Sequence, residues 1–472
     1  MFEFKEVSFS YEKTNQTVLE KVNFQIKQGS LTLITGPSGS GKSTLLKLMN
    51  GLIPRVYPGK IEGAILFEKR SLQQVSQEFI SKHIGYVSQD PRGQFFTTNT
   101  TSELVFAMEN FGLRPNIMRE KVKELTELLE LSTLLNRSIF SLSSGERQKI
   151  SIGCSLSLSA KFIILDEPSS NLDVQAIQKL MELLMDLKKK GFTIVVAEHR
   201  VHYLAALIDQ VLLVNNQTVT VSTIQSLSQT GNPPLRKLAL FQNQIEFPYS
   251  EIENEVILSV KAMSYHAILK AINFDIKAGD SIGIIGKNGV GKTTLLKLLM
   301  NIIQPTTGKL VAHTKQKIAP FLVMQEMDYQ FFTESVASEL ALGNEHIDKQ
   351  QQDALLKKMG LYTMKNRSPF DLSGGEKQRL LVAIAVLAKT NLFLFDEPTS
   401  GLDNHNMKKV ATLITNLKTK GAVVIATHDA EFLYKTCNRI LYLKNGELVE
   451  EWKLHENDGN VIKQLFQKMI HE

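Results

Sequence analysis

Apolar residues run into a glycine turn at two places in the chain, and a segment with helical spacing follows each turn. The runs at 30–36 (SLTLITG) and 280–286 (DSIGIIG) are typical of buried strands. Leucines in the segments at 43–51 (STLLKLMNG) and 293–301 (TTLLKLLMN) predict helices. Strand, turn and helix in this order predict an α/β sheet. Residues 116–136 carry apolar residues at largely helical spacing between charged ones, which predicts a helix with a core-facing stripe.

The pattern occurs twice. Residues 7–54 align with residues 260–305, and the later motifs follow in the same order in each half. A period of half the chain indicates duplicated domains rather than a solenoid. We expect a first domain over 1–220 and a second over 255–472. The stretch 221–254 contains GNPP and no sustained period, so we expect a linker there with one short helix.

Composition narrows the class of protein. Hydrophobic residues make up 43% and charged residues 22% of the 472 residues, which is typical of a globular protein with more than one domain. No apolar run approaches the roughly 20 residues that cross a bilayer, and the start MFEF does not resemble a signal peptide, so we expect a cytosolic chain. Cys154 and Cys437 are too few for a disulfide framework and are expected to be small buried side chains. The net charge of +6 is mild and identifies no partner.

Two stretches, 36–43 (GPSGSGKS) and 286–293 (GKNGVGKT), match the pattern G-x-x-x-x-G-K-[ST]. Backbone N–H groups of such a loop and the start of the following helix hold phosphate oxygens, and glycine leaves room for the phosphates to approach. The lysine neutralises the β- and γ-phosphates, and the hydroxyl after it binds Mg²⁺. The residues expected to hold ATP here are Gly36, Pro37, Ser38, Gly39, Ser40, Gly41, Lys42, Ser43, Thr44, Gly286, Lys287, Asn288, Gly289, Val290, Gly291, Lys292, Thr293 and Thr294, with Ser43 and Thr293 also on the metal.

Paired carboxylates follow a predicted strand in each half, at 161–173 (KFIILDEPSSNLD) and 391–403 (NLFLFDEPTSGLD). An Asp-Glu pair alone is usually a polar strand end. Its place after a phosphate loop, with a proline and a second aspartate at equal spacing in both halves, points to catalysis. The aspartate is expected in the Mg²⁺ shell and the glutamate beside the attacking water. These residues are Asp166 and Glu167 in the first half, and Asp396 and Glu397 in the second.

A third pair of motifs precedes each carboxylate strand, at 141–153 (SLSSGERQKISIG) and 371–383 (DLSGGEKQRLLVA). Each predicts small residues that open a helix, where exposed N–H groups bind anions. The residues expected to contact nucleotide here are Ser143, Ser144, Gly145, Ser373, Gly374 and Gly375.

These motifs in this order resemble the ATP-binding-cassette ATPases over nearly the whole chain. The resemblance implies two tandem cassettes, each with a phosphate-loop core containing a mixed or parallel sheet, an antiparallel β part and a helical signature subdomain. It implies ATP hydrolysis with ATP and Mg²⁺ as cofactors. It also implies glutamines that sense Mg²⁺ and water, histidines at the γ-phosphate, aspartates in loops at the cassette interface, and tyrosines that stack on adenine. By position these are Gln89 and Gln325, His199 and His428, Asp173 and Asp403, and Tyr11 and Tyr265.

In that family two cassettes close head to tail around ATP, so the resemblance implies two sites within this one chain. One would use Lys42, Asp166, Glu167 and His199 facing Ser373, Gly374 and Gly375. The other would use Lys292, Asp396, Glu397 and His428 facing Ser143, Ser144 and Gly145.

Two positions depart from the pattern of the family. Ser144 stands where the second half has glycine, and its Cβ is expected to weaken the site around Lys292. We therefore predict two competent but unequal sites. Glu198 replaces the usual small or hydroxyl residue before the histidine, as AEHR against ATHD, and the sequence does not indicate what this changes.

The fold alone leaves the function open, because such ATPases drive transport, ribosome remodelling and DNA management. The first hypothesis is an importer ATPase without its own membrane part. The second is a soluble tandem-cassette translation factor on the ribosome, a class with a long, charged helical linker; the linker here is about 34 residues long, contains proline and is not strongly basic, which disfavours this hypothesis. DNA-repair cassettes are split by long coiled coils, and this chain keeps its motifs close together. Tandem sugar-import ATPases often have a degraded second motif, whereas both halves are intact here.

A glutamine-phenylalanine pattern favours one importer class. Residues 87–96 (VSQDPRGQFF) and 323–332 (VMQEMDYQFF) share two glutamines and a Phe-Phe pair. The first stretch has the form Q-x-P-x-x-Q-F-F, with NGLIP upstream at 50–54, and so resembles the ATPases of energy-coupling factor transporters. These transporters import vitamins and transition-metal ions and include fused forms linked to thiamine and its precursor hydroxymethylpyrimidine. Gln94 and Gln330, with the phenylalanines, are expected to face a membrane partner; the alternative is plain surface glutamines.

The resemblance also implies the partners. These are an integral membrane coupling subunit and a substrate-binding membrane subunit, without nucleic acid. The chain would be peripheral, on the cytoplasmic face of the cell membrane, and attached through its partners. Because a separate subunit binds the substrate, the identity of that vitamin, precursor or metal ion is not readable from this chain.

Overall fold

The chain forms two compact units, Met1–Leu238 and Ala239–Glu472, each with its own sheets and core. The boundary falls inside the expected linker, where α8 (Ile224–Gln229) forms one short helix. GNPP lies outside the described residues. The structure is a computed structural model and describes residues 1–12, 17–229, 249, 254–314, 317–342, 347–455 and 458–471.

The first unit contains an antiparallel sheet of order β2-β1-β4-β5 and a six-stranded sheet of order β10-β9-β3-β8-β7-β6. In the larger sheet all neighbouring pairs are parallel except β9 and β10. The strands are β1 (Phe2–Tyr11), β2 (Thr17–Ile26), β3 (Leu31–Thr35), β4 (Gly59–Phe67), β5 (Arg70–Ser71), β6 (Ile84–Val87), β7 (Phe162–Asp166), β8 (Thr193–Ala197), β9 (Gln210–Asn215) and β10 (Thr218–Ser222). Its helices besides α8 are α1 (Lys42–Met49), α2 (Leu52–Arg55), α3 (Gln77–His83), α4 (Thr100–Asn110), α5 (Pro115–Leu129), α6 (Ser144–Leu156) and α7 (Val174–Lys189).

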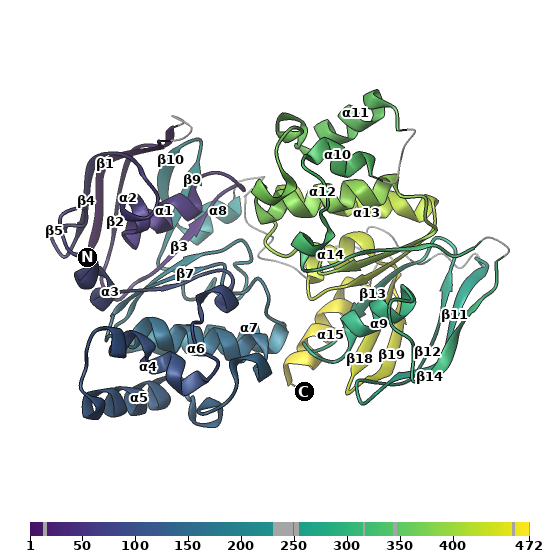
Figure 1. The fold of residues 1–472 in the computed structure, drawn as a ribbon, viewed down its shortest axis with the longest axis horizontal. Coiled ribbons are helices and arrows are strands. Elements are labelled where there is room, and N and C mark those ends of the chain that lie inside the picture. The colour runs from purple at the N-terminus through teal and green to yellow at the C-terminus, as the bar shows by residue number, and fades with distance from the viewer. Residues whose placement is uncertain are drawn as a thin grey trace. The chain divides into compact units, whose positions relative to one another are not determined.

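Sequence pattern explains which strand joins which sheet. Strand β1 alternates between buried and more exposed positions, as expected for an antiparallel strand with one solvated face. Strands β3 and β8 are buried throughout and mostly apolar, as expected for central parallel strands. Figure 1 shows the antiparallel strands on one side of β3 and the helices α4 to α7 on the other.

The second unit repeats this plan. Its sheets have the orders β12-β11-β14 and β15-β16-β17-β13-β18-β19 (Figure 1). The strands are β11 (Val256–Tyr265), β12 (Leu269–Lys277), β13 (Ser281–Ile285), β14 (Thr307–Ala312), β15 (Pro320–Val323), β16 (Leu392–Asp396), β17 (Ala422–Ala426), β18 (Arg439–Lys444) and β19 (Glu447–Lys453). The helices are α9 (Lys292–Leu299), α10 (Val336–Ala341), α11 (Lys349–Met359), α12 (Gly374–Leu387), α13 (Asn404–Asn416), α14 (Ala430–Thr436) and α15 (Gly459–His471).

The predicted α/β class with antiparallel and helical parts is therefore confirmed. The predicted helical stripe forms α5, where Leu125 and Leu129 are buried, although Ile117 at its start is exposed. Cys437 is buried as expected, whereas Cys154 is only partly buried. Among the described residues no helix has the length and hydropathy needed to cross a membrane.

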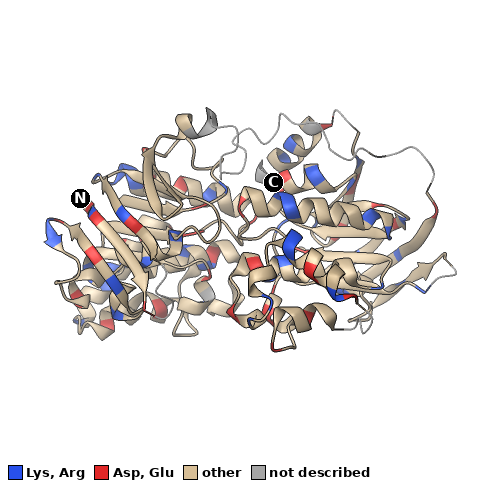
Figure 2. Cartoon of the chain, turned by 90° about the horizontal axis from the view of Figure 1, so that it is seen from above, with Lys and Arg blue, Asp and Glu red and all other residues tan. Residues whose placement is uncertain are grey.

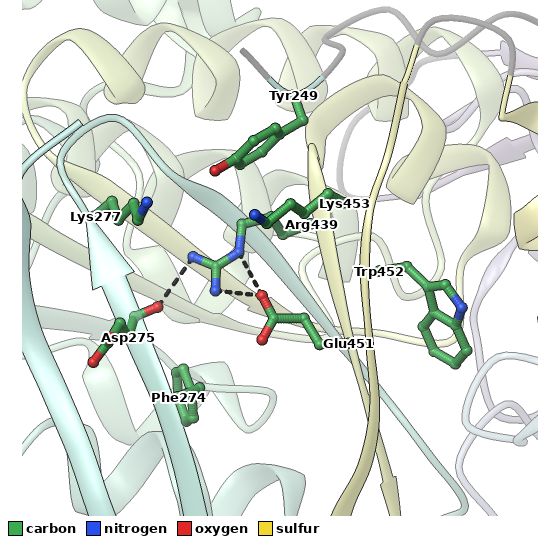
Figure 3. Close-up of a pocket in the computed structure, with 8 residues that line it drawn as sticks. All are labelled: Tyr249, Phe274, Asp275, Lys277, Arg439, Glu451, Trp452 and Lys453. Atoms are coloured by element: carbon green, nitrogen blue, oxygen red, sulfur yellow. Dashed lines mark hydrogen bonds and ion pairs between the residues drawn. The ribbon is translucent and has the colours of Figure 1, made fainter. Parts of the chain in front are cut away.

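A buried arginine joins three strands of the second unit. Arg439 on β18 is 4% exposed and forms an ion pair with Asp280, which is also buried. Its guanidinium donates to Glu451 Oε1 from Nε (3.0 Å) and Nη2 (2.6 Å) and to the carbonyl of Asp275 (3.0 Å). Figure 3 shows this cluster beside a pocket of about 670 Å³ that β12, β18, β19 and Tyr249 line. The pocket contains no residue of the phosphate loops, so its arginine holds strands together rather than serving the predicted site.

Replacing this arginine should destabilise the second unit strongly. Arg439→Met leaves the Asp280 carboxylate buried without its cation, and such losses lower the free energy of unfolding by about 3–5 kcal/mol. Urea unfolding followed by the fluorescence of Trp452, the one tryptophan of the chain, reports on this unit. Lys453→Met, on the exposed rim of the same pocket, is the control and should change stability by less than about 0.5 kcal/mol. Equal effects of the two changes would contradict the buried-pair explanation.

Candidate functional site

Each phosphate loop links a buried strand to a helix, β3 to α1 and β13 to α9. A Cβ on Gly36 would lie 2.0 Å from the carbonyl oxygen of Val214, so the loop passes too close to β9 for any other residue. Gly286 has the same constraint against Leu443, at 2.4 Å. Gly41 begins α1 with φ of 105°, and no side chain caps the helix. The positive end of the helix therefore faces the loop without a side-chain cap, which suits a phosphate.

The loop lysines are buried over their own loops. Lys42 Nζ donates to the carbonyls of Gly36 (3.0 Å) and Pro37 (2.9 Å), and Lys292 makes the equivalent bonds at 2.7 and 3.1 Å. Ser40 Oγ is buried and has no hydrogen-bond partner among the described residues. A buried hydroxyl without a partner, beside lysines held by carbonyls, fits an anionic ligand such as a phosphate chain.

The aspartates end the strands next to these loops. Thr293 Oγ1 donates to Asp396 Oδ2 at 2.6 Å, which joins the loop hydroxyl and the strand carboxylate of the second unit. In the first unit Tyr86 donates to Asp166 at 3.3 Å, and Ser43 is exposed in the first turn of α1. Burial raises the pKa of Asp166 to about 6 and raises that of Asp396 as well.

Mg²⁺ fits this set of donors. Hydroxyl and carboxylate oxygens are its preferred protein ligands, and it commonly uses one or two of them together with substrate phosphates. No group of three or more His, Cys, Asp or Glu side chains within the described part of the chain forms a metal site on its own. The nucleotide would therefore supply the remaining ligands.

The glutamates predicted to be catalytic occupy a constrained backbone position. Glu167 and Glu397 have φ of 43° and 48°, in the left-handed region, and their N–H groups donate to the ends of β8 (2.8 Å) and β17 (2.9 Å). Non-glycine residues in this region cost energy and are concentrated at functional sites. The bond to the neighbouring strand fixes the glutamate just beyond the sheet edge.

In the first unit three predicted residues come together. Gln89 Nε2 donates to Glu167 Oε2 at 2.9 Å, and His199 Nε2 lies 3.5 Å from Glu167 Oε1. Burial, followed by the charges of Glu198 and Asp166, raises the pKa of Glu167 to about 8. A raised pKa suits a carboxylate that accepts a proton from water.

The second unit arranges the same residue types differently. His428 Nε2 lies 3.8 Å from Glu397 Oε1, 2.9 Å from Lys292 Nζ and 3.0 Å from Asn288 Oδ1. Thr427 Oγ1 donates to Glu397 Oε2 at 3.0 Å. Here the histidine connects the phosphate loop to the catalytic carboxylate. The second predicted sensing glutamine, Gln325, is exposed two residues after β15.

The two tyrosines differ in what they contact. The hydroxyl of Tyr11 lies 3.0 Å from Thr44 Oγ1, which places the tyrosine at the helix that follows the phosphate loop. Tyr265 ends β11 and packs edge-on against His266, with ring centroids 4.5 Å apart. Adenine stacking by either ring stays a prediction.

The predicted helix starts form as expected. Ser143 begins α6 in a capping box: its Oγ accepts from the N–H of Glu146, whose carboxylate accepts from the N–H of Ser143. Ser373 and Glu376 form the same box at α12. A Cβ built on Gly374, the counterpart of Ser144, would meet no atom of the described residues within 4 Å. A serine at this position is thus compatible with the fold of a cassette.

The interface aspartates also have a local structural role. Asp173 caps α7 by accepting from the N–H of Ala176 at 2.9 Å, and Asp403 caps α13 by accepting from that of Asn406 at 2.7 Å. Helix capping therefore explains these two residues within each unit, and their predicted role at the cassette interface stays a prediction.

The second glutamines of the glutamine-phenylalanine pattern, Gln94 and Gln330, form hydrogen bonds within their own loops. Gln94 accepts from the N–H of Ser88 (3.0 Å) and donates to the carbonyl of Tyr86 (3.3 Å). Gln330 makes the equivalent bonds to residues 324 and 322, at 2.7 and 2.8 Å. Each amide therefore braces the loop that contains the sensing glutamine. The predicted face toward a partner depends on the phenylalanines.

Two buried glutamates that the sequence reasoning missed hold those phenylalanines in place. Glu103 accepts from the N–H groups of Phe96 (3.2 Å) and residue 97 (2.7 Å), and Glu339 accepts from those of Phe332 (3.0 Å) and residue 333 (2.8 Å). Phe96 and Phe332 are each 76% exposed. The available signal was the triplet SEL, whose glutamate follows the second phenylalanine by the same spacing in both halves.

Comparison with known proteins identifies the family. The chain matches the family model described as ABC transporter over residues 19–170 and 269–400, and it belongs to this family. Both matched spans contain a phosphate loop and an Asp-Glu pair, so the chain is an ATP hydrolase with two cassettes.

Similar chains span nearly the whole length. A Treponema denticola protein named "Putative ABC transporter ATP-binding protein" is 38% identical over 96% of this chain and 97% of its own length. A Bacillus subtilis protein named "Putative HMP/thiamine import ATP-binding protein YkoD" is 30% identical over 93% of this chain and 89% of its own. A chain in the crystal structure of archaeal ribosomal stalk protein aP1 with the ribosome recycling factor aABCE1 superposes with a TM-score of 0.68 over 98% of this chain and 92% of that chain. At 22% identity that likeness concerns the fold alone.

We expect the two predicted catalytic glutamates to contribute unequally to ATP turnover. Glu167→Gln and Glu397→Gln each remove one carboxylate base without changing side-chain size. Because the hydrogen bonds to Glu167 and Glu397 differ, we expect residual ATP turnover to differ between the two variants by more than about threefold, measured as phosphate release at saturating MgATP. The double variant is the control for background hydrolysis. Equal residual rates would contradict the predicted inequality.

Proposed function

We propose that this chain is the ATPase subunit of an importer whose membrane-spanning parts are separate chains, and that it couples hydrolysis at two sites to uptake. The observation that carries the proposal is the repeated, braced phenylalanine beside each sensing glutamine. Phe96 lies seven residues after Gln89, and Phe332 lies seven after Gln325. Both side chains are exposed although their backbones are held by buried carboxylates.

A rigid, exposed aromatic side chain is typical of an anchor for a partner. Phenylalanine loses little entropy when its backbone is already fixed, and aromatic anchors dominate the binding energy of many interfaces. Phe96 stacks on Phe106 of α4, with ring centroids 4.9 Å apart, so the first unit presents a pair of aromatic rings. In the proposed importer, a cytoplasmic helix of the membrane subunit covers this face. The same loop contains the sensing glutamine, so ATP chemistry and partner binding share one segment.

The chain's own residues support hydrolysis in the following way. The loop N–H groups and Lys42 or Lys292 hold the phosphates, and Mg²⁺, bound by Asp166 or Asp396 with the loop hydroxyl, would neutralise developing charge. Glu167 or Glu397 accepts a proton from water at the carboxylate. His199 or His428 contacts that carboxylate and orients it.

Completion of each site by the other cassette is also part of the proposal. The capping boxes at Ser143 and Ser373 fix two exposed helix N-termini, and the positive end of a helix favours anions. In the head-to-tail arrangement implied by the family, each would face the phosphate loop of the other cassette. Tyr11 and Tyr265 would then contact the adenine.

A ribosomal role is the second candidate, and the charge distribution argues against it. Lys and Arg residues are interspersed with Asp and Glu along the described residues of both units, as Figure 2 shows. A nucleic-acid-binding protein commonly has a continuous basic face or stripe. Along the described residues, the fold likeness to the ribosome recycling factor is therefore not accompanied by a continuous basic stripe in Figure 2.

The proposed cargo is a vitamin, a vitamin precursor or a metal ion. The printed name of the Bacillus subtilis relative refers to import of HMP and thiamine. The pattern Q-x-P-x-x-Q-F-F of the first cassette, with NGLIP upstream, is the sequence feature that resembles energy-coupling factor importers in our interpretation. The cargo would be bound by the separate membrane subunit.

Affinity purification from membranes tests this function. A tagged chain, expressed in its native host and extracted in mild detergent, should retain two integral membrane proteins. The double variant Phe96→Ser/Phe332→Ser should reduce their recovery about tenfold or more, because aromatic anchors are lost, while ATP turnover stays near the wild-type value.

Val449→Ser is the matched control, since Val449 is exposed on β19, at the opposite edge of its sheet from β15, the strand that precedes the loop of the second unit. It should leave the membrane proteins bound. Recovery with ribosomes alone, or full retention of the membrane proteins by the phenylalanine variant, would contradict the proposal.

A further inference from the structure

Each cassette has a buried carboxylate next to the predicted catalytic histidine, before it in one sequence and after it in the other. The first has Glu198 before His199, and the second has Asp429 after His428. Glu198 and Asp429 are 3% and 4% exposed. The repeat therefore conserves a buried acid at this place although the sequence position has moved.

Both acids bind the same hydroxyl. Ser169 and Thr399 occupy the position directly after the Asp-Glu-Pro triplet. Ser169 Oγ donates to Glu198 Oε2 at 2.6 Å, and Thr399 Oγ1 donates to Asp429 Oδ2 at 2.6 Å. The bond connects the segment after the catalytic glutamate to the segment that contains the histidine in each cassette.

Glu198 also fixes the backbone around the histidine. Its Oε1 accepts from the N–H groups of His199 (2.8 Å) and Arg200 (3.1 Å), and its Oε2 accepts from the hydroxyl of Tyr203 (3.1 Å). With Ser169, both carboxylate oxygens have donors. An uncharged replacement cannot accept all of these bonds.

Asp429 also fixes the backbone near its histidine, through a different hydrogen bond. It caps α14 by accepting from the N–H of Phe432 at 3.2 Å. In the first unit Arg200 stands at the capping position, and the described residues 202–207 form turns where the second unit has α14. Because a capping side chain stabilises a helix start, the lack of a capping aspartate at position 200 is consistent with the lack of a helix over these residues.

The exchange also changes the catalytic glutamate's surroundings. Thr427, before His428, donates its hydroxyl to Glu397 at 3.0 Å. Glu198 occupies that position in the first cassette and brings a second negative charge instead. The charges of Lys42 and Arg200 act in the opposite direction, so the pKa of Glu167 is raised less than burial and the neighbouring carboxylates alone would raise it. Glu198 and Arg200 therefore have opposite effects on the pKa of Glu167.

We infer that Glu198 is a positioning residue of the first ATP site, where it performs the task that Asp429 performs in the second. Glu198 and Arg200 can be replaced together by the threonine and the aspartate of the other cassette, but neither can be replaced alone. The inference rests on ATP hydrolysis by the cassettes and not on the proposed transport role.

A swap of the two residues tests this in the full chain. The variants are Glu198→Thr, Arg200→Asp and the double change, which recreates the Thr-His-Asp order of the second cassette. Hydrolysis is measured with radiolabelled ATP under single-turnover conditions. Two backgrounds are used: Glu397→Gln, in which the first site keeps its glutamate, and Glu167→Gln, in which the second site does.

In the Glu397→Gln background, Glu198→Thr should lower the rate constant about tenfold to a hundredfold, as expected for lost hydrogen bonds to a charged group. The enzyme concentration that gives the half-maximal rate constant should change by less than about threefold, because the phosphate loop is untouched. The double change should recover most of the rate, since Asp at position 200 can accept from Ser169 and Thr at position 198 can donate to Glu167. In the Glu167→Gln background the same changes should alter the rate by less than about twofold.

A double variant no faster than the slower single variant would overturn the inference, as would equal losses in both backgrounds. If either background hydrolyses too little ATP to measure, the single and double changes are compared in the wild-type chain instead. A double variant no faster than the slower single variant overturns the inference there as well. Glu198→Gln, which keeps the side-chain volume, is the second variant should Glu198→Thr fail to fold. An unchanged rate for Glu198→Gln, with ATP binding retained, would also overturn the inference.

Discussion

The parallel register of the central strands is the constraint on which both sites depend. Ile34 of β3 and Asp166 of β7 both pair with Ala197 at the end of β8. Parallel strands that end in register bring their following loops to one edge of the sheet. The phosphate loop, the catalytic glutamate and the histidine therefore converge although they are far apart in the sequence. The second unit repeats this with Ile284, Asp396 and Ala426.

The apolar framework is duplicated much more closely than the polar networks it carries. Both units bury a strand of five residues before the loop and another before the acidic pair. The partners of the catalytic glutamate nevertheless differ, with Gln89 in one and Thr427 in the other. Burial of apolar surface tolerates few alternatives at the core, whereas a buried acid can be replaced by another that reaches the same donor. The two sites are thus built on one plan and held by different hydrogen bonds.

The repeated QFF segment illustrates how a motif can be recognised before its role is understood. Its recurrence predicted a shared function, and the exposure of Phe96 and Phe332 agrees with a surface role. The second glutamines turned inward, because the loop's backbone groups at residues 86, 88, 322 and 324 needed partners near the sheet edge. The buried acids Glu103 and Glu339 were missed because nothing local to SEL distinguishes a loop brace from an ordinary first-turn glutamate.

By itself, the sequence determined the duplicated α/β plan, the phosphate loops, the acidic pairs and the capped helix starts, since these depend on local periodicity and on backbone conformations that particular residues favour. The tertiary structure decided which polar groups meet: Thr293 with Asp396, Gln89 with Glu167, and Ser169 with Glu198. Such pairs join strands and loops separated by tens of residues, and hydrogen bonds require distances that spacing along a chain does not determine. The meaning of Glu198 before the histidine emerged for this reason only when its buried donors were placed around it.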